Sequence, residues 1–148
     1  MKNYFIATAN DRFAKLWKNT EITFKELADR LSRTTTTAET VGEFRNMPKS
    51  KQDNIKDVGG FVGGRLKNGI RQREKVECRS LITLDADFAA PDFCESIDMF
   101  ANYSFIIYST HKHTAEKPRL RLIIPLSRNC TAEEYEAVAR KIAEEIGI

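Results

Sequence analysis

The chain has 148 residues, of which 41% are hydrophobic and 30% are charged. This length fits one domain with a sizeable core, and the composition argues against both a disordered tail and a membrane protein. No apolar run approaches the roughly 18 residues that a bilayer span needs. The first ten residues hold too short an apolar stretch for a secretion signal. We therefore predict a cytoplasmic protein.

The net charge of +3 is compatible with binding of nucleic acids or nucleotides, but many ordinary enzymes share it. The distribution of charge is more informative than the total. Residues 65–75 carry five basic side chains against one acid, namely Arg65, Lys67, Arg71, Arg73 and Lys75 against Glu74.

The three cysteines match neither a disulfide framework nor a zinc pattern, so we expect reduced, mostly buried thiols.

Residues 1–57 are predicted to form a helical N-terminal segment. Phe13, Leu16 and Trp17 suggest a short helix, and Thr23 with Glu26 forms the capping box of a second one. The run Arg33–Thr37, with four successive threonines, interrupts the helical pattern, because threonine loses rotamer freedom in a helix. A weak helix is expected over residues 39–46, and a solvated helix or loop over residues 48–57.

Residues 58–148 are predicted to form an α/β core. Two glycine pairs in residues 58–64 favour a strand with tight bends or a close backbone approach, and Asn68-Gly69 indicates a hairpin turn. We therefore predict an α+β fold, with an antiparallel or mixed sheet and flanking helices in one compact domain. Strands are predicted at residues 80–87, 104–110 and 119–126, and helices at residues 92–101 and, after a second capping box of Thr131 and Glu134, at residues 131–146.

Asp85 and Asp87 end the first of these strands. Because side chains alternate along a strand, the two carboxylates should point to the same face. Such a pair can hold Mg²⁺ or Mn²⁺, and two-metal phosphoryl chemistry needs ligands of this kind. The alternative is that both aspartates only cap the loop before Pro91.

Ser109 and His111 come at the end of the next strand and are expected to share a face. Both side chains can donate hydrogen bonds to phosphate oxygens. The only two histidines of the chain, His111 and His113, lie two residues apart, which favours function over a purely structural role. His-x-His is also a metal-ligand pattern, so zinc or manganese binding by the pair is a second interpretation.

Arg119 and Arg121 are expected on one face of the last strand, with leucine and isoleucine on its core face. Paired guanidinium groups suit phosphate oxygens, although a solvated sheet face or ion pairs with Asp85 and Asp87 would explain them equally well. The three strands together present an acidic pair, a Ser/His pair and a basic pair. A nucleotidyl-transfer site requires this combination of groups.

Three motifs carry a resemblance: Leu-Asp-Ala-Asp at residues 84–87, Ser-Thr-His at residues 109–111, and the basic strand after them. Their order resembles the archaeo-eukaryotic primase superfamily, whose first motif is a strand ending in Asp-x-Asp and whose second is Ser-x-His. More closely, the sequence is similar to phage and prophage replication proteins of the virulence-associated protein E type. In these, a primase-polymerase domain precedes a helicase-like ATPase domain. The resemblance is good over residues 56–148 and looser before them.

The resemblance implies an RRM-like catalytic sheet packed with a second α/β unit. It also implies primer synthesis from nucleoside triphosphates on a single-stranded DNA template, with Mg²⁺ or Mn²⁺, in a bacterial cell or a phage-infected host. Carried over by motif, Asp85 and Asp87 would be the catalytic metal ligands, and Ser109 and His111 would hold the triphosphate. Arg119 and Arg121 are added from strand geometry alone.

One departure from the family pattern concerns the end of the chain. The third motif of the family supplies another acidic metal ligand on a later strand, beyond a helix like the one predicted here. Because the sequence stops at Ile148, we expect an N-terminal fragment of a longer protein. Its metal site would be incomplete, and it would polymerise poorly or not at all.

Two other functions fit parts of the sequence. A single-strand nicking endonuclease of the rolling-circle or relaxase type also uses an RRM-like sheet, a histidine pair and a nucleophilic tyrosine, for which Tyr135 is the candidate. That class needs a hydrophobic residue between its histidines, where this chain has Lys112. A non-catalytic nucleic-acid-binding module would use the basic residues 65–75 for backbone contacts.

Overall fold

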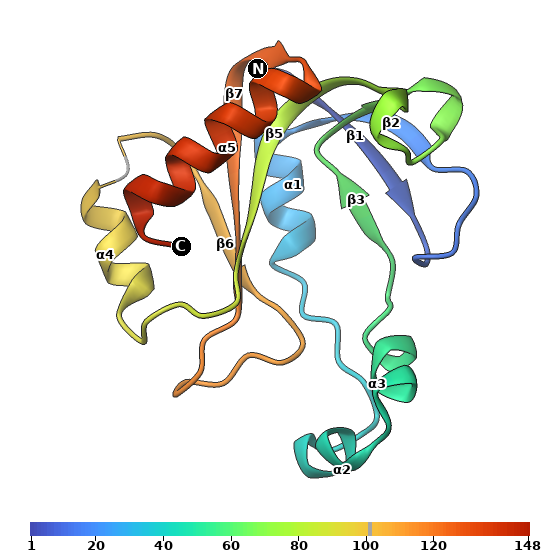
Figure 1. The fold of residues 1–148 in the computed structure, drawn as a ribbon, viewed down its shortest axis with the longest axis vertical. Coiled ribbons are helices and arrows are strands. Elements are labelled where there is room, and N and C mark those ends of the chain that lie inside the picture. Colours follow the sequence, from blue (N-terminus) through green and yellow to red (C-terminus); the bar gives the residue numbers. More distant parts are fainter. Residues whose placement is uncertain (101) are drawn as a thin grey trace.

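The protein is an α+β structure with two antiparallel sheets (Figure 1). The computed structural model describes residues 1–100 and 102–148, and only the backbone of residues 98–100. The elements are β1 (Asn3–Ala9), β2 (Lys18–Thr23), α1 (Phe24–Leu31), α2 (Val41–Asn46), α3 (Lys49–Ile55), β3 (Gly60–Val62), β4 (Gly64–Leu66), β5 (Val76–Ala86), α4 (Phe93–Phe100), β6 (Ile106–Ser109), β7 (Leu120–Cys130) and α5 (Ala132–Ile146).

The sequence predicted a helical N-terminal segment, but part of this segment forms β-strands. β1 and β2 pair in an antiparallel hairpin, and β3 joins the free edge of β1, so the order of this N-terminal sheet is β2-β1-β3. The helix predicted around Phe13 is absent. A turn stands there instead, in which Asp11 accepts a hydrogen bond from the backbone of Phe13. Trp17 then donates its backbone N–H to the carbonyl of Gly69. Contacts far away in the sequence therefore override the local pattern.

The other helix predictions for this segment are confirmed. α1 begins at the capping box of Thr23 and Glu26, in which each residue bonds to the backbone of the other. α2 has an equivalent box formed by Thr40 and Glu43. The segment predicted as either a solvated helix or a loop contains the short helix α3. No regular element covers the run Arg33–Thr37.

Glycines mark the point where the chain passes from one sheet to the other. Gly63 separates β3, in the N-terminal sheet, from β4, which begins the second sheet. A Cβ at Gly63 would lie 2.8 Å from the Cβ of Leu81, and one at Gly64 would lie 2.2 Å from the carbonyl oxygen of Cys78. Neither position has room for a side chain, which confirms the predicted close approach. The glycine-rich segment thus forms two short strands in different sheets.

The Asn68-Gly69 turn forms as predicted, with φ of 55° and 70°. It does not join its two strands directly, however. Residues 67–75 connect β4 to β5 through this turn and a second short one at Arg73–Lys75.

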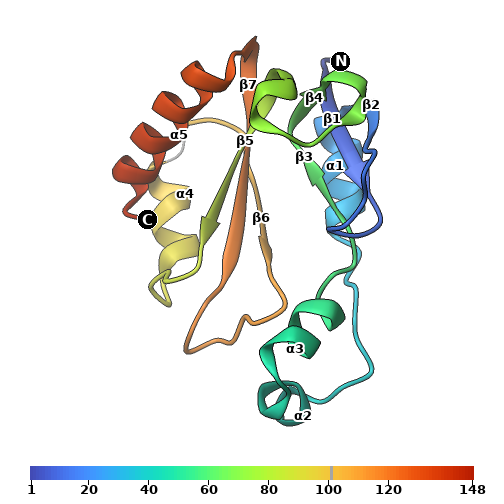
Figure 2. The ribbon, with the colours of Figure 1, turned by 45° about the vertical axis from the view of Figure 1, so that its right-hand side comes forward.

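The second, C-terminal sheet has the order β4-β5-β7-β6, and all of its neighbouring strands are antiparallel. The succession β5-α4-β6-β7-α5, with β7 between β5 and β6, is the split β-α-β arrangement of RRM-like folds, and β4 occupies the edge beyond β5. Figure 2 shows this sheet between the pair α4 and α5 on one side and the N-terminal sheet with α1 on the other. The predicted fold class is therefore confirmed.

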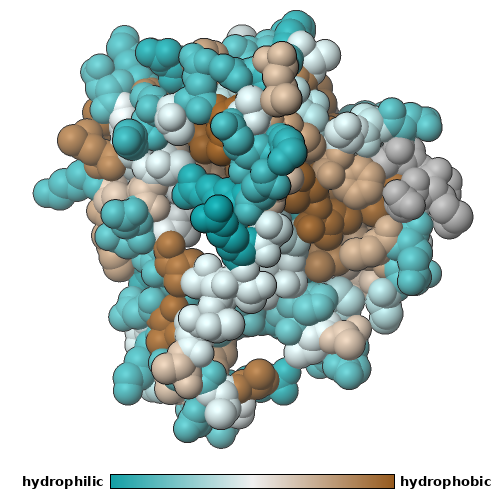
Figure 3. Space-filling view, turned by 180° about the vertical axis from the view of Figure 1, so that it is seen from behind, coloured by the Kyte–Doolittle hydropathy of each residue, from teal (hydrophilic) through white to brown (hydrophobic). Residues whose placement is uncertain are grey.

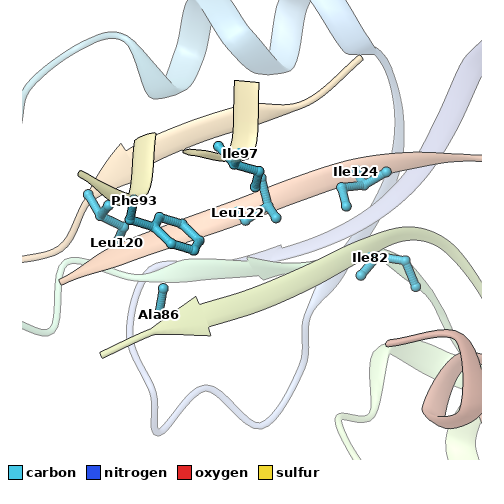
Figure 4. Close-up of a cluster of buried hydrophobic side chains, with 7 residues drawn as sticks. All are labelled: Ile82, Ala86, Phe93, Ile97, Leu120, Leu122 and Ile124. Carbon is cyan, nitrogen blue, oxygen red and sulfur yellow. The ribbon is translucent and has the colours of Figure 1, made fainter. Parts of the chain in front are cut away.

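Each face of the C-terminal sheet has its own core. On one face, Phe93 and Ile97 of α4 pack against alternate residues of β5 and β7 (Figure 4). On the other face, Leu81 and Ile123 pack against Ile6 of β1 and Leu27 of α1, and all four are almost fully buried. Burying both faces explains the apolar character of β5 and β7. The strand residues of the first core are Ile82, Ala86, Leu120, Leu122 and Ile124.

The surface is mostly polar. Figure 3 shows hydrophilic side chains over most of the rear face, with apolar side chains in smaller areas. Among the described residues, no helix is long and apolar enough to cross a membrane. All three cysteines are free, and burial raises the pKa of Cys78 and Cys130. Cys130 is buried, but Cys78 is half-buried and Cys94 is exposed, so the expectation of mostly buried thiols is wrong.

Candidate functional site

The predicted aspartates, serine and arginines lie at one end of the C-terminal sheet, where β5 and β6 end and β7 begins. In the antiparallel register Asp85 lies opposite Arg121, and Arg121 lies opposite Tyr108 on the other side. Residues that are directly opposite share a face. The three side chains therefore lie together on the face of the sheet that is turned towards the N-terminal segment.

Two ion pairs join β5 to β7 at this end. The Nε of Arg121 lies 2.6 Å from Asp85 Oδ1, and the Nη1 of Arg119 lies 3.3 Å from Asp87 Oδ1. We call these four residues the carboxylate–arginine cluster. The aspartate side chains remain 55% and 51% exposed, so a ligand can reach them from solvent. The sequence had allowed ion pairs as one explanation of the two arginines, and the register confirms that the strands are neighbours.

Arg121 is the more firmly held of the two arginines. Burial opposes its charge, but hydrogen bonds with Asp85 and Tyr108 outweigh that effect and raise the pKa of Arg121 above its ordinary value. The guanidinium therefore stays positive near neutral pH. It offers a fixed cationic group at the centre of the cluster.

Ser109 and His111 do not share a face, contrary to the expectation from strand alternation. Ser109 lies opposite Leu120, which belongs to the core beneath α4. The chain then turns, because the backbone N–H of His113 bonds to the carbonyl of Thr110. Strand alternation thus ends before His111, and only His111 is directed towards the N-terminal segment.

His111 is held by residues of the N-terminal segment. Its Nε2 lies 3.2 Å from the hydroxyl of Thr37, and its ring centroid lies 4.4 Å from that of Phe44 on α2. The ammonium group of Lys112 lies 5.9 Å from the centroid of the same phenylalanine ring. The loop from β6 to β7 is thereby attached to α2. These contacts fix the position of the imidazole beside the open end of the sheet.

His113 has a structural partner. Its Nδ1 accepts a hydrogen bond from the backbone N–H of Arg119, which closes the base of the loop from β6 to β7. With Nδ1 of His113 used as an acceptor, the two histidines make different contacts. Among the described residues, no group of three or more histidine, cysteine or acidic side chains is placed to hold a metal ion. The geometry gives the His-x-His metal interpretation no support.

Two carboxylates are nevertheless a suitable donor set for one kind of metal binding. Mg²⁺ is commonly bound through one or two carboxylates, with substrate phosphates and water completing its shell. Asp85 and Asp87 are exposed enough to serve in this way, and they lie beside two guanidinium groups that can bind phosphate. The donor set therefore fits a metal ion that arrives together with a phosphate ligand.

Sequence reasoning missed several neighbours of the cluster. Tyr108 lies beside Arg121, and Phe88 follows Asp87 with 94% of its surface exposed. The guanidinium carbon of Arg119 lies 5.8 Å from the centre of the Phe88 ring. A large aromatic residue directly after the Asp-x-Asp motif was visible in the sequence. The contacts of Thr37 and Phe44 with His111 were not, because more than sixty residues separate them.

The remaining candidates lie elsewhere in the fold. The hydroxyl of Tyr135 on α5 bonds to the backbone and side chain of Thr83, on the edge of β5 that β4 leaves unpaired. His111 lies beyond the level of Ala86 on the same sheet, so the tyrosine and the histidine do not come together. The basic residues 65–75 lie in β4 and in the connection to β5, at the opposite end of the sheet from Asp85 (Figure 2).

Comparison with known families gives a match over nearly the whole chain. A family model described as the VapE N-terminal domain matches residues 2–148. The chain therefore belongs to the VapE N-terminal domain family, and with it to the phage and prophage replication proteins of the virulence-associated protein E type. No curated protein and no solved structure matches the chain. The closer of the two sequence resemblances is thus confirmed.

Proposed function

We propose that this chain is part of a primase-polymerase of the archaeo-eukaryotic primase superfamily and that it binds nucleoside triphosphate with Mg²⁺ or Mn²⁺. Asp85 and Asp87 would bind the metal, and His111 would bind the triphosphate together with Arg119 and Arg121. Ser109 stands on the other face of the sheet, so its contribution requires a ligand that reaches around the strand end. Single-stranded DNA would serve as the template.

The observation that carries this proposal is the pairing of two half-exposed carboxylates with two arginines at the open end of the sheet. A metal–triphosphate complex supplies a partner for each of the four groups, since the metal takes the carboxylates and the phosphates take the guanidinium groups. When the ligand replaces the two ion pairs in this way, every charged group of the cluster still has a partner of opposite charge.

The residues of the cluster suit the proposed reaction. In nucleotidyl transfer, a 3′-hydroxyl oxygen forms a bond to the α-phosphorus, and the bond from that phosphorus to the bridging oxygen breaks to release pyrophosphate. A bound metal ion would stabilise the attacking and leaving oxygens. Arg121, which stays positive, and Arg119 would hold the phosphate oxygens and stabilise the charge on the leaving group. His111, which Thr37 and Phe44 hold in place, would bind the same ligand through its remaining ring nitrogen.

The test is calorimetric titration with a ribonucleoside and a deoxyribonucleoside triphosphate, each with Mn²⁺ and with a chelator. The wild type is compared with Asp85→Asn/Asp87→Asn. With Mn²⁺ we expect the variant to lose roughly tenfold or more in affinity, because its metal ligands are gone. With chelator we expect the variant to bind the nucleotide more tightly than the wild type does. It no longer carries the carboxylates that repel the phosphates, and its two arginines are free to bind them.

The matched control is Asp29→Asn/Asp53→Asn, which removes two exposed aspartates that pair with Lys25 and Lys56 away from the cluster. It should bind as the wild type does under both conditions. A wild type that binds no nucleotide with Mn²⁺, or an affinity that Asp85→Asn/Asp87→Asn leaves unchanged, would contradict the proposal. Mn²⁺ alone should bind weakly, because two carboxylates supply only part of its shell.

A further inference from the structure

The structure places a second group of arginines at the other end of the C-terminal sheet. Arg71, Arg73 and Arg79 line an open cavity of about 300 Å³ between β4, β5 and the connection that joins them. Arg79 comes from β5 and was not part of the basic stretch seen in the sequence. Six residues separate it from Asp85, or about 20 Å along a strand. The remaining lining residues are Val62, Leu66, Gln72 and Val76.

Two of these arginines are held by aromatic rings and have no acidic partner. The guanidinium carbon of Arg79 lies 4.0 Å from the ring centre of Tyr135, and that of Arg71 lies 5.0 Å from the ring centre of Trp17. Among the described residues, neither arginine makes an ion pair or a side-chain hydrogen bond, and the Nε of Arg79 is buried without a partner. A guanidinium stacked on a ring keeps its N–H groups free at its edge.

Acidic groups nearby neutralise only part of this charge. Arg73 pairs with Glu136 at 2.7 Å, Arg65 pairs with Glu77 at 2.9 Å, and Glu74 lies in the connection itself. Arg71, Arg79, Lys67 and Lys75 have no such pair among the residues that the structure describes. The local balance is therefore positive, and the free donors are those of Arg71 and Arg79 inside the cavity.

We propose that this arginine cavity binds phosphate groups of a single-stranded nucleic acid. Planar N–H donors that lack a carboxylate match phosphate oxygens, and the flanking Lys67 and Lys75 extend the positive surface beyond a single phosphate. The two rings are already covered by the arginines, so they are not available to stack on bases. Binding is therefore to the backbone and is independent of sequence. The cavity is separate from the carboxylate–arginine cluster, and the proposal does not depend on metal or nucleotide binding there.

The experiment is fluorescence anisotropy of the full chain with labelled single-stranded DNA of about 16 nucleotides, in chelator, between about 50 and 200 mM salt. Arg71→Gln/Arg79→Gln should lose roughly tenfold or more in affinity at the lower salt concentration. The slope of log affinity against log salt should become shallower by about 1.4, the value for two lost phosphate contacts on a single strand. Two oligonucleotides of different sequence should give the same result.

Arg30→Gln/Arg33→Gln removes the same charge from exposed positions on α1 and just after it, and serves as the matched control. Equal losses in the two variants, or no loss in Arg71→Gln/Arg79→Gln, would overturn the proposal. An unlabelled nucleoside triphosphate is added as competitor at equal phosphate concentration. If it displaces the DNA as well as unlabelled strand does, the ligand is a free nucleotide and the assignment to a strand is wrong.

Circular dichroism checks that each variant is folded. If the glutamine variant does not fold, Arg71→Lys/Arg79→Lys carries the test, because it keeps the charge but loses the planar donors and the stacking. Weaker binding with an unchanged salt slope supports the proposal, and wild-type affinity contradicts it. Asp85→Asn/Asp87→Asn should bind this DNA at least as tightly as the wild type. The proposal for the arginine cavity and the proposal for the carboxylate–arginine cluster can therefore be contradicted independently of each other.

Discussion

Gly64 shows how single residues fix the junction between the two sheets. The backbone of β4 runs so close to β5 that a Cβ at Gly64 would meet the carbonyl oxygen of Cys78 at 2.2 Å. Ser80 adds a link of its own, since its buried hydroxyl donates a 2.7 Å hydrogen bond to the carbonyl of Phe5 in the N-terminal sheet. Small residues at these two points let β5 lie close to β4 and also bond to β1 of the N-terminal sheet.

Gly64→Ala should therefore lower the free energy of unfolding by roughly 1–3 kcal/mol, because the backbone must shift to admit the methyl group. Urea unfolding followed by circular dichroism measures this change. Gly42→Ala is the matched control, since a Cβ there has no neighbour within 4 Å and α2 gains a better helix former. The control should be neutral or more stable than the wild type. A Gly64→Ala variant as stable as the control would refute the steric explanation.

At the scale of elements, capping boxes set where three helices begin. In α5 the box of Thr131 and Glu134 is reinforced by Arg128, whose guanidinium lies 2.8 Å from Glu134. The hydrogen bond from Arg128 and the backbone bond at Thr131 lower the pKa of Glu134 to about 2. The cap thus couples the end of β7 to the start of the helix that covers the sheet.

Stability should depend on pH through this residue. Because the pKa of Glu134 is lower in the folded state than its ordinary 4.5, its contribution is complete above pH 4.5 and disappears as the pH falls towards 2. We expect the Tm of the wild type to fall more steeply across this window than that of Glu134→Gln. Glu133→Gln, which changes an acid of the same turn outside the box, is the control and should keep the wild-type slope. Equal slopes in all three proteins would contradict the assignment.

At the scale of the whole molecule, α2 connects the N-terminal segment to the candidate site. Phe44 is 6% exposed and packs against His111, in the loop between β6 and β7. Figure 2 shows α2 and α3 beneath the two sheets, on the side to which this loop extends. The helical part of the N-terminal segment therefore supports a loop that the sequence places far from it.

Phe44→Ala should loosen this loop without unfolding the sheet. We expect faster hydrogen exchange over residues 110–119, since the loop loses its packing partner, and unchanged protection in the central strand β5. Val41→Ala truncates an exposed residue of the same helix and is the control. Unaltered exchange in the loop would show that the contact with α2 does not hold it. Exchange that rises equally in β5 would show instead that Phe44 supports the global fold.

Much of the local structure could be predicted from the sequence alone. The capping boxes at Thr23 and Thr131, the turn at Asn68-Gly69 and the strands β5, β6 and β7 depend on neighbours a few residues apart, so short-range rules identify them. The Asp-x-Asp motif and the basic strand were visible for the same reason. The resemblance to the family could also be recognised from the sequence, because the stretches that carry it are short and lie in order along the chain.

Tertiary structure decided which of these residues meet. β1 and β2 are strands because they complete a sheet with β3 and pack on Leu81 and Ile123, which no local pattern reveals. The turn after Thr110 takes His111 away from Ser109 and towards α2. Arg79 joins the arginines of the β4–β5 connection, although it lies outside the basic stretch at residues 65–75. Each of these outcomes depends on strand register and on contacts between distant segments, and a single sequence records only the order of its residues.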